Sequence, residues 1–306
     1  MEGTVIKSTG SWYDVRNAEG KIYKCRIKGR FRLEDIKHTN PIAVGDKVVF
    51  ELENNVETGV IEKIEPRTNY IIRKASNLSK QTHIIASNLD QALLMVTIAT
   101  PATSNGFIDR FLMTAEAYHI SVVLVFNKID LCVENVKIQL DETVKLYQNI
   151  GYKCLLTSAK NKIGIDEVKK ELINKTTLIC GHSGVGKSSL LNTIENTLNL
   201  TTKEVSKSTN KGQHTTTFAE MHQLNFGGYI VDTPGIREFG VVDFEKVEIS
   251  HYFKEMQTLI GSCKFNNCIH LNEPDCAIIK AVENEKISAH RYKSYLSILN
   301  NEDAFE

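Results

Sequence analysis

The sequence predicts a multi-domain α/β protein: an N-terminal OB-fold β-barrel, a central parallel sheet with helices on both faces, and a C-terminal helical domain. Three observations indicate this. The first 70 positions contain short β-prone runs separated by Gly, Asn and Asp turns. From about residue 71, continuous apolar runs alternate with helical periodicity, which is typical of a buried parallel sheet. Cysteines and a histidine cluster near the end, so the expected domains are 1–70, 71–240 and 241–306.

Length and composition suit a packed protein of two or three domains, because the chain has 306 residues and is 42% hydrophobic. No segment approaches the roughly 20 consecutive apolar residues of a membrane helix, and the first residues lack the apolar run of a signal peptide. We therefore expect a cytoplasmic protein that contacts no membrane. The formal net charge is zero, so any RNA contact would have to use a local patch.

The N-terminal region indicates a barrel of four or five strands, and the OB-fold is the commonest nucleic-acid-binding form of such a barrel. The expected strands are 3–6, 21–27, 46–51 and 59–64. Five cations occupy alternate positions and would share one face of an extended strand: Lys24, Arg26, Lys28, Arg30 and Arg32. Two interpretations of this stripe remain open, an RNA-binding patch and a solvated outer face. A bend at Gly29 would interrupt the stripe.

The central region contains five apolar runs that we expect to form the sheet: 92–98, 120–126, 153–156, 177–180 and 229–231. Ligands of such sheets bind at the carboxyl ends of the strands. The candidate nucleotide motifs each follow one of these strands.

A glycine-rich motif follows the strand at 177–180 and precedes a helical run at 189–194. This context is required for a phosphate-binding loop, in which backbone N–H groups surround phosphate oxygens at a helix N-terminus. Lys187 is a candidate catalytic residue because it is expected to reach the β- and γ-phosphates. Ser188 is expected to bind Mg²⁺. The candidate nucleotide-binding residues of the loop are Gly181, His182, Ser183, Gly184, Val185, Gly186, Lys187, Ser188 and Ser189.

The run Asn127-Lys128-Ile129-Asp130 follows the strand at 120–126 and indicates guanine recognition. The carboxylate of Asp130 can accept hydrogen bonds from N1–H and the 2-amino group of guanine, and adenine offers neither donor. Thr157-Ser158-Ala159-Lys160 follows the strand at 153–156 and can offer backbone N–H groups to guanine O6, although a plain turn would have the same residues. The candidate base-binding residues are Asn127, Lys128, Asp130, Ser158, Ala159 and Lys160.

Two further segments are expected to respond to the γ-phosphate. Asp232 and Gly235 follow the strand at 229–231, where the carboxylate can hold the Mg²⁺ shell and the glycine backbone can face the γ-phosphate. The loop 211–217 contains Thr216 and Thr217, either of which could bind the γ-phosphate, and we assign Mg²⁺ to Thr216. An ordinary turn and a loop without a role are the alternatives.

The residue after Gly235 is Ile236, whereas many GTPases carry a glutamine there to orient the attacking water. An aliphatic side chain cannot do this. His214 is the candidate catalytic residue because its imidazole could position or deprotonate the water. A surface histidine without a catalytic role is the alternative.

The guanine motif precedes the phosphate loop, which reverses the usual order in GTPases. The sequence therefore predicts a circularly permuted P-loop GTPase domain that binds GTP or GDP with Mg²⁺. Such a permutation is tolerable because all motifs remain at the same edge of one sheet and only the termini move.

The C-terminal cysteine cluster has the spacing Cys-x₄-Cys-x-His-x₅-Cys, formed by Cys263, Cys268, His270 and Cys276. Three thiolates and one imidazole make the closed tetrahedral set of a structural Zn²⁺ site, with chance buried thiols as the alternative. The tail that follows contains basic and aromatic residues, and we interpret it as a simple surface helix: His290, Arg291, Tyr292, Lys293 and Tyr295.

Together these motifs resemble the RsgA/YjeQ family, the ribosome small-subunit-dependent GTPases of bacteria. The resemblance covers essentially the whole chain, and it includes the Gly212-x-His214-Thr215-Thr216-Thr217 switch and the apolar Ile236. It implies an assembly factor that binds the maturing small ribosomal subunit, contacts its rRNA, and hydrolyses GTP to GDP and phosphate mainly when bound there. It also implies that His214 matches the proposed catalytic histidine of the family.

A second hypothesis treats the nucleotide as a structural ligand only, with the barrel and the zinc domain forming an RNA adaptor. In either case we expect a monomer. An unrelated GTP-driven RNA-modifying enzyme would need a second catalytic constellation, and the sequence offers none.

Overall fold

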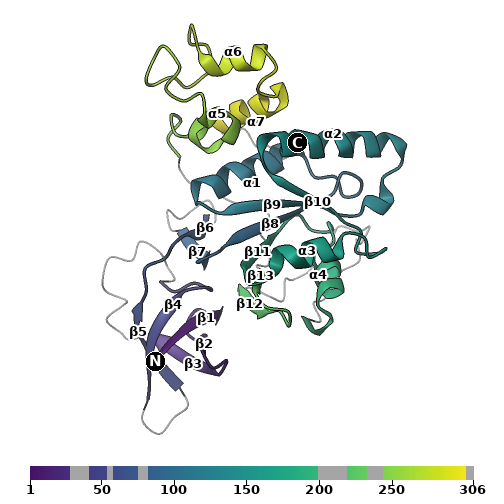
Figure 1. Ribbon diagram of the computed structural model, residues 1–306. Coiled ribbons are helices and arrows are strands. Elements are labelled where there is room, and N and C mark those ends of the chain that lie inside the picture. Colours follow the sequence, from purple (N-terminus) through teal and green to yellow (C-terminus); the bar gives the residue numbers. More distant parts are fainter. Residues whose placement is uncertain (28–40, 54–57, 75–81, 199–218, 233–243, 301–306) are drawn as a thin grey trace, which may run out of the picture.

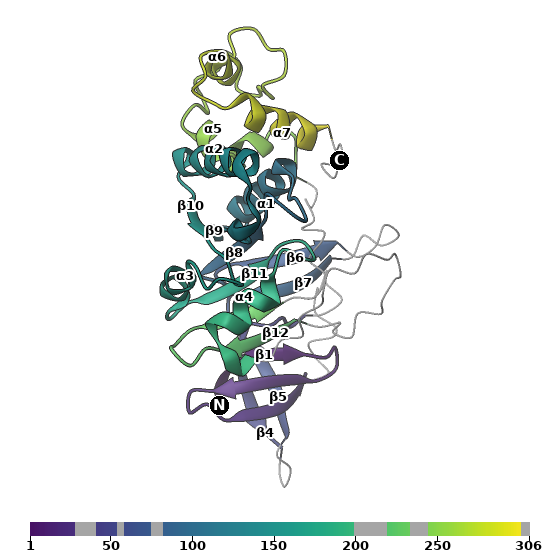
Figure 2. The same cartoon turned by 90° about the vertical axis from the view of Figure 1, so that its right-hand side faces the viewer.

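The computed structural model describes residues 1–27, 41–53, 58–74, 82–198, 219–232 and 244–300 (Figure 1). Both views show three parts arranged one after another, with the barrel at one end, the central sheet in the middle and the helical C-terminal part at the other end (Figure 2). This arrangement agrees with the predicted multi-domain α/β fold.

The N-terminal barrel consists of five strands: β1 (Glu2–Ser8), β2 (Tyr13–Asn17), β3 (Ile22–Ile27), β4 (Lys47–Leu52) and β5 (Thr58–Ile64). The strand order is β1-β2-β3-β5-β4, and β4 pairs back with β1, which closes the barrel. The β3–β5 pair is parallel and the other pairs are antiparallel. Strand β2 is not among the expected strands, whereas the other four are.

Side chains along β3 alternate between the inside and the outside of the barrel. Tyr23 and Cys25 are buried in the barrel core, while Lys24 and Arg26 are exposed on the other face. Arg26 forms an ion pair with Glu53 on this outer face. The remaining cations of the stripe, Lys28, Arg30 and Arg32, lie outside the described residues.

The central sheet consists of β8 (Gln91–Val96), β9 (Ser121–Phe126), β10 (Lys153–Leu156), β11 (Thr176–Cys180), β12 (Glu220–Gln223) and β13 (Tyr229–Asp232). The strand order is β10-β9-β8-β11-β13-β12. The five expected strands run parallel, and β12, which the sequence does not predict, joins antiparallel at one side. Strand β11, which leads into the phosphate loop, comes after β8, β9 and β10 in the chain but pairs with β8 in the sheet. This pairing is consistent with the predicted permutation.

Two helices cover each face of this sheet. The even-numbered side chains of β8, such as Leu94, pack with α1 (Asn105–Ala117) and α2 (Glu134–Ile150) in one core cluster. The odd-numbered side chains, such as Leu93, pack with α3 (Ile165–Leu172) and α4 (Lys187–Ile194) in another. Because strand side chains alternate between faces, the continuous apolar pattern of β8 gives a sheet covered on both sides. Two short 3₁₀ helices, η2 (Ile129–Leu131) and η3 (Asn196–Leu198), complete this region.

A hairpin of β6 (Tyr70–Lys74) and β7 (Thr82–Ser87) connects the barrel to the central sheet, and the sequence does not predict it. The buried carboxylate of Asp46 accepts hydrogen bonds from Arg67 at 2.6 and 2.7 Å and from the hydroxyl of Ser87 at 2.6 Å. Strand β1 also pairs with β12 through Lys7 and Glu220, so barrel and central strands form one continuous sheet. The barrel is therefore attached at two places.

The C-terminal part contains η4 (Ile249–Tyr252), α5 (Lys254–Gln257), α6 (Ala277–Glu283) and α7 (Ala289–Leu299). Its buried side chains form their own core cluster, which includes Phe253, Ile278 and Ile298. Met113 of α1 belongs to the same cluster, so the central domain contributes to this core. Among the described residues, no helix is both long enough and apolar enough to cross a bilayer.

The expectation of a simple surface helix is wrong for Arg291 and Tyr295, which are fully buried in α7. The guanidinium of Arg291 donates to Asp109 of α1 at 2.6 Å and to the two carboxylate oxygens of Glu255 at 2.6 and 3.0 Å. A buried charge is stable only when it is paired in this way. Only the outer face, with His290 and Lys293, is exposed as expected.

Candidate nucleotide-binding and metal sites

The phosphate loop leaves the carboxyl end of β11 and leads into α4. Gly181 and Gly186 have φ angles of 137° and 96°, a region that residues with side chains rarely adopt. A Cβ at Gly181 would lie 2.3 Å from the carbonyl oxygen of Met95, and one at Gly186 would lie 2.5 Å from Nδ2 of Asn127. Only glycine fits at these two positions, so the loop backbone can approach a ligand closely.

The ammonium group of Lys187 lies against the loop itself. It donates hydrogen bonds to the carbonyl oxygens of Gly181 at 2.7 Å and His182 at 2.8 Å. Its charge acts on the buried thiol of Cys180, as does that of Asp232, which ends β13 beside β11. Burial, the largest effect, raises the pKa of Cys180 above its usual range. Lys187 and Asp232 therefore both lie near Cys180, at the carboxyl ends of the neighbouring strands β11 and β13.

The predicted guanine motif contacts the phosphate loop directly. Asn127, buried at the end of β9, donates from Nδ2 to the carbonyl oxygen of Val185 at 2.8 Å. Its Oδ1 accepts from the hydroxyl of Thr157 at 3.1 Å and from the backbone N–H of Ala159 at 3.3 Å. One side chain thus joins three motifs that are far apart in the sequence.

Asp130 lies in η2, and its carboxylate accepts a hydrogen bond from the hydroxyl of Ser158. The same hydroxyl oxygen accepts from the backbone N–H of Asn161 at 3.1 Å, which fixes the turn. Asp130 is otherwise exposed, as is Lys160 in the turn. Lys128 has a φ of 62° and donates to the carbonyl oxygen of Thr100 at 3.0 Å.

The described residues bring together the predicted phosphate and base motifs. Ser188 and Ser189 lie in the first turn of α4, next to Lys187. The switch residues His214, Thr216, Thr217 and Gly235 lie outside the described residues.

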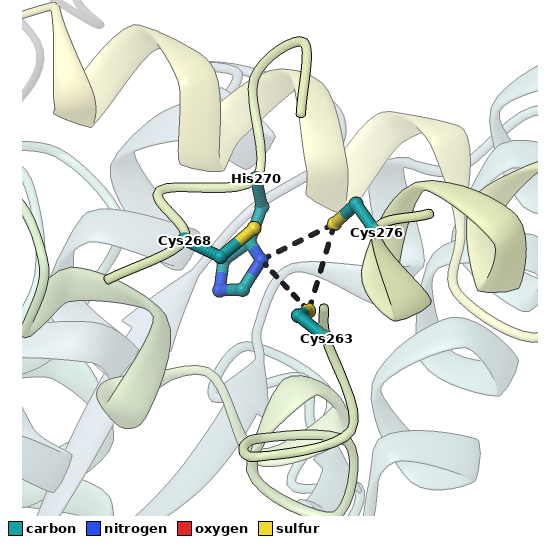
Figure 3. Close-up of side chains that lie close together, drawn as sticks. All are labelled: Cys263, Cys268, His270 and Cys276. Atoms are coloured by element: carbon teal, nitrogen blue, oxygen red, sulfur yellow. Dashed lines mark hydrogen bonds between the residues drawn. The ribbon is translucent and has the colours of Figure 1, made fainter. Parts of the chain in front are cut away.

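The four predicted zinc ligands converge in the C-terminal part, with their ligand atoms all within 4.8 Å of one another (Figure 3). The Sγ atoms of Cys263 and Cys276 are 3.8 Å apart, and Nδ1 of His270 lies 3.6 and 3.3 Å from them. A tetrahedral zinc ion with bonds of about 2.3 Å to sulfur has ligands about 3.8 Å apart. The cluster has the dimensions of such a site.

Backbone and tyrosine contacts hold the ligand residues in place. The N–H of Ala277 donates to Sγ of Cys263 at 3.4 Å, and the N–H of Ile279 donates to Sγ of Cys276 at 3.5 Å. From α7, the hydroxyl of Tyr292 donates to the carbonyl oxygen of His270 at 2.6 Å. Contacts of this kind orient metal ligands in other proteins.

The donor chemistry of the cluster also fits a cation. Burial raises the pKa of the Cys268 thiol to about 12 and also raises the pKa of Cys276. Without a cation these buried thiols would stay protonated at neutral pH, whereas a bound Zn²⁺ would stabilise the thiolates. The donor set and the spacing therefore fit Zn²⁺.

Family models match nearly the whole of the two N-terminal parts. The model described as RsgA GTPase matches residues 64–242, which is more than half of the chain, and the RsgA N-terminal domain model matches residues 2–61. The chain belongs to the RsgA GTPase family. It is therefore a GTP hydrolase with a circularly permuted GTPase domain, and family membership implies GTP and GDP as nucleotides and Mg²⁺ as their metal ion.

Relatives in the RsgA family cover essentially the full length. The chain is 54% identical to the small ribosomal subunit biogenesis GTPase RsgA of Christiangramia forsetii, over 99% of this chain and 97% of that protein. It is 56% identical to the protein of the same name from Flavobacterium psychrophilum, over 99% of this chain and 94% of that protein.

Two solved structures of the family are also similar. The crystal structure of YjeQ from Thermotoga maritima has a TM-score of 0.78 at 35% identity, covering 100% of this chain and 99% of that one. The crystal structure of YloQ, described as a circularly permuted GTPase, has a TM-score of 0.76 at 29% identity. The match covers 100% of this chain and 96% of that one. The predicted OB-like barrel and permuted GTPase fold are confirmed.

Two residues outside the candidate site residues contact the motifs of this RsgA family member. Thr157, the first residue of the predicted motif after β10, donates from its hydroxyl to Asn127. Phe107 of α1 lies against the imidazole of His182 in the phosphate loop. Phe107 is separated from the loop by more than 70 residues, so no local pattern could have indicated it.

Proposed function

We propose that this chain binds the small ribosomal subunit through its rRNA and hydrolyses GTP to GDP and phosphate during late maturation of that subunit, with turnover stimulated by the subunit. The observation that carries the nucleotide part is the hydrogen bond from Asn127 to Val185, because it joins a base motif to a phosphate loop. The subunit part rests on the names of relatives that are more than 50% identical over nearly the full length.

In this proposal, the loop Gly181–Ser188 surrounds the phosphates with backbone N–H groups at the start of α4. Lys187 exchanges its two carbonyl contacts for oxygens of the β- and γ-phosphates. Ser188, Thr216 and Asp232 would hold Mg²⁺ and its shell, and the ion would neutralise negative charge on the phosphates. The fit is supported by the glycines of the loop, where a Cβ would collide with neighbouring atoms.

The base lies at the other end of the site. Asp130 accepts from the two donors of guanine, and Ser158 holds that carboxylate in position. The backbone of Ala159 and Lys160 faces guanine O6, while the aliphatic stem of Lys128 lies near Gly186. Asn127 fixes the spacing between base and phosphates.

Hydrolysis forms a bond from a water oxygen to the γ-phosphorus and breaks the bond to the bridging oxygen, which leaves with GDP. His214 positions this water or accepts its proton, because Ile236 cannot. Thr217 and Gly235 contact the γ-phosphate.

The C-terminal ligands Cys263, Cys268, His270 and Cys276 hold one structural Zn²⁺, which stabilises a small domain. We further expect the protein to act as a monomer and, given its ribosomal target, in the cytoplasm.

The test is GTP turnover with and without purified small subunits, with large subunits as the control. We expect strong stimulation by small subunits only. Lys187→Ala should lose both binding and turnover, whereas His214→Ala should bind GTP normally and lose the stimulated turnover. Binding to the subunit without any change in turnover would reject the proposal in favour of an RNA adaptor.

A further inference from the structure

Helix α1 begins beside the phosphate loop. Its N-cap, Ser104, accepts a hydrogen bond from the backbone N–H of Phe107 at 3.3 Å, which fixes the first turn. The Phe107 ring is 5% exposed and belongs to the core cluster on the α1 and α2 face of the sheet. Its centroid lies 3.8 Å from that of the His182 imidazole, with 37° between the ring planes. A core residue therefore contacts a residue of the loop directly.

Two residues of the phosphate loop, His182 and Val185, contact neighbouring elements through both their side chains and their carbonyl oxygens. His182 packs on Phe107, and its carbonyl oxygen accepts from Lys187 at 2.8 Å. Val185 is fully buried, and its carbonyl oxygen accepts from Asn127. Glycines with positive φ lie next to both residues, so the backbone between them has little intrinsic stiffness. The Phe107 contact thus contributes to restraining the loop geometry that Lys187 needs.

Two residues after Phe107, the same helix is tied to the C-terminal part. Oδ1 of Asp109 accepts from Arg291 of α7 at 2.6 Å and from the hydroxyl of Tyr147 at 2.8 Å. The side chains of Asp109 and Arg291 are both 0% exposed. Met113, one turn further along α1, is buried in the core of the C-terminal part. The C-terminal part therefore contributes to the position of α1 on the sheet.

We propose that Phe107 is a positioning residue for the phosphate loop and that Arg291, through Asp109 on the same helix, holds Phe107 in place. Docking of the C-terminal domain and nucleotide affinity are then linked, and each strengthens the other by the same factor. This inference rests on the proposed nucleotide site.

The first test compares Phe107→Leu with Phe107→Tyr. Leucine keeps an apolar side chain but loses the contact between the two rings. For typical aromatic pairs, the energy of this contact corresponds to a change of about two- to tenfold in an equilibrium constant. We expect a fluorescent GDP analogue to bind two- to tenfold more weakly to F107L and normally to F107Y.

Leu112→Ala serves as the matched control. Leu112 is buried in the same helix and cluster, but five residues of a helix rotate it about 140° away from Phe107. L112A should lower the melting temperature at least as much as F107L while leaving GDP affinity unchanged. All measurements are made well below the lowest melting temperature. Equal affinity losses in F107L and L112A would overturn the positioning role.

The second test is a double-mutant cycle with Arg291→Lys, which keeps the charge and loses the planar fork. We expect R291K to weaken GDP binding two- to fivefold in the wild type and to have no further effect in F107L. Should R291K not fold, Glu255→Gln takes its place, since it weakens the contact that orients the Arg291 guanidinium.

Additive losses in the cycle would overturn the link between Arg291 and Phe107. An affinity of F107L equal to that of the wild type would overturn the positioning role. Failure of the wild type to bind GDP would instead reject the proposed nucleotide site, so the two proposals fail in distinguishable ways.

Discussion

The side chain of Asn127 donates a hydrogen bond to the backbone carbonyl of Val185, 58 residues later in the chain and 2.8 Å away. Both groups are buried, and Oδ1 of the same amide accepts from Thr157. The amide therefore acts as a fixed spacer between the base end and the phosphate end of the site.

Replacement of Asn127 by alanine should leave the Val185 carbonyl and the Thr157 hydroxyl without these partners. Unpaired buried polar groups cost about 1–3 kcal/mol each, so we expect a loss of about 2 kcal/mol in the free energy of unfolding. GDP should also bind at least tenfold more weakly. Urea denaturation and a fluorescent GDP titration measure the two effects, with the exposed Asn161→Ala as the control. Wild-type GDP affinity in N127A would refute the spacer role.

Asp130→Asn should change which base is preferred. The carboxylate pairs with two guanine donors, whereas an amide offers a donor that suits the 2-oxo group of xanthine. We expect GTP affinity to fall at least tenfold and XTP affinity to rise, both measured by calorimetry. Lys160→Ala, also exposed in the base-binding region, should retain the preference for GTP. An unaltered ratio of GTP to XTP affinity in D130N would contradict the assignment.

The zinc assignment predicts one ion per chain by mass spectrometry of the metal content. Cys268→Ser should abolish binding, because a serine hydroxyl is not deprotonated at neutral pH and is a poor zinc ligand. The C-terminal part should then unfold at a lower temperature than in the wild type. Cys132→Ser is the control, since Cys132 lies near the base motif, and it should retain a full complement of metal. Stoichiometric zinc in C268S would exclude Cys268 as a ligand.

The ionisation of two thiols, that of the buried Cys25 and that of the partly buried Cys154, should be shifted to high pH by folding. Burial raises the pKa of Cys25 to about 11 and that of Cys154 to about 12. At pH 8 both should be alkylated by iodoacetamide more than a hundredfold more slowly in the folded than in the unfolded protein, as peptide mapping by mass spectrometry can measure. Their contribution to stability should be complete below about pH 8.5 and decline as the pH rises towards 11, because only the unfolded thiols ionise in that range. Rapid alkylation of native Cys25 at pH 8 would be inconsistent with its burial.

Asp109→Asn should destabilise the contact between the central and C-terminal parts. Loss of one partner from a buried ion pair costs 3–5 kcal/mol, and we expect about 3 kcal/mol because Glu255 still pairs with Arg291. Lys254→Ala breaks the partly exposed pair with Glu116 and should cost less than about 1 kcal/mol. Guanidinium denaturation compares the two variants. A smaller loss in D109N than in K254A would show that the buried pair is not what holds α1.

The phosphate-loop context and the convergence of the four C-terminal cysteine and histidine side chains could be predicted because each pattern is local. Gly181–Ser188 needs only its own strand and helix, and the ligand spacing of the C-terminal cluster lies within 14 residues. The convergence of base and phosphate motifs also follows from the sequence, since the carboxyl ends of parallel strands share one edge of a sheet.

Features that depend on distant partners could not be predicted. Arg291 is buried because Asp109, 182 residues earlier, neutralises it, and no pattern around Arg291 reveals that. Strand β12 is only four residues long and alternates weakly, and it forms through pairing with β13. Strand β2 is also short, with five residues, and its register is set by β1 and β3.

The position of β11 has a consequence for synthesis of the chain on the ribosome. Strands β8, β9 and β10 emerge first, and β8 remains an open edge until β11, the strand that pairs with it, has been made. Strand β8 therefore waits through some 80 residues of translation, from Val96 to Thr176, with one edge unpaired. The nascent chain cannot hold a nucleotide until Gly181–Ser188 has left the exit tunnel, so competence to bind is acquired late.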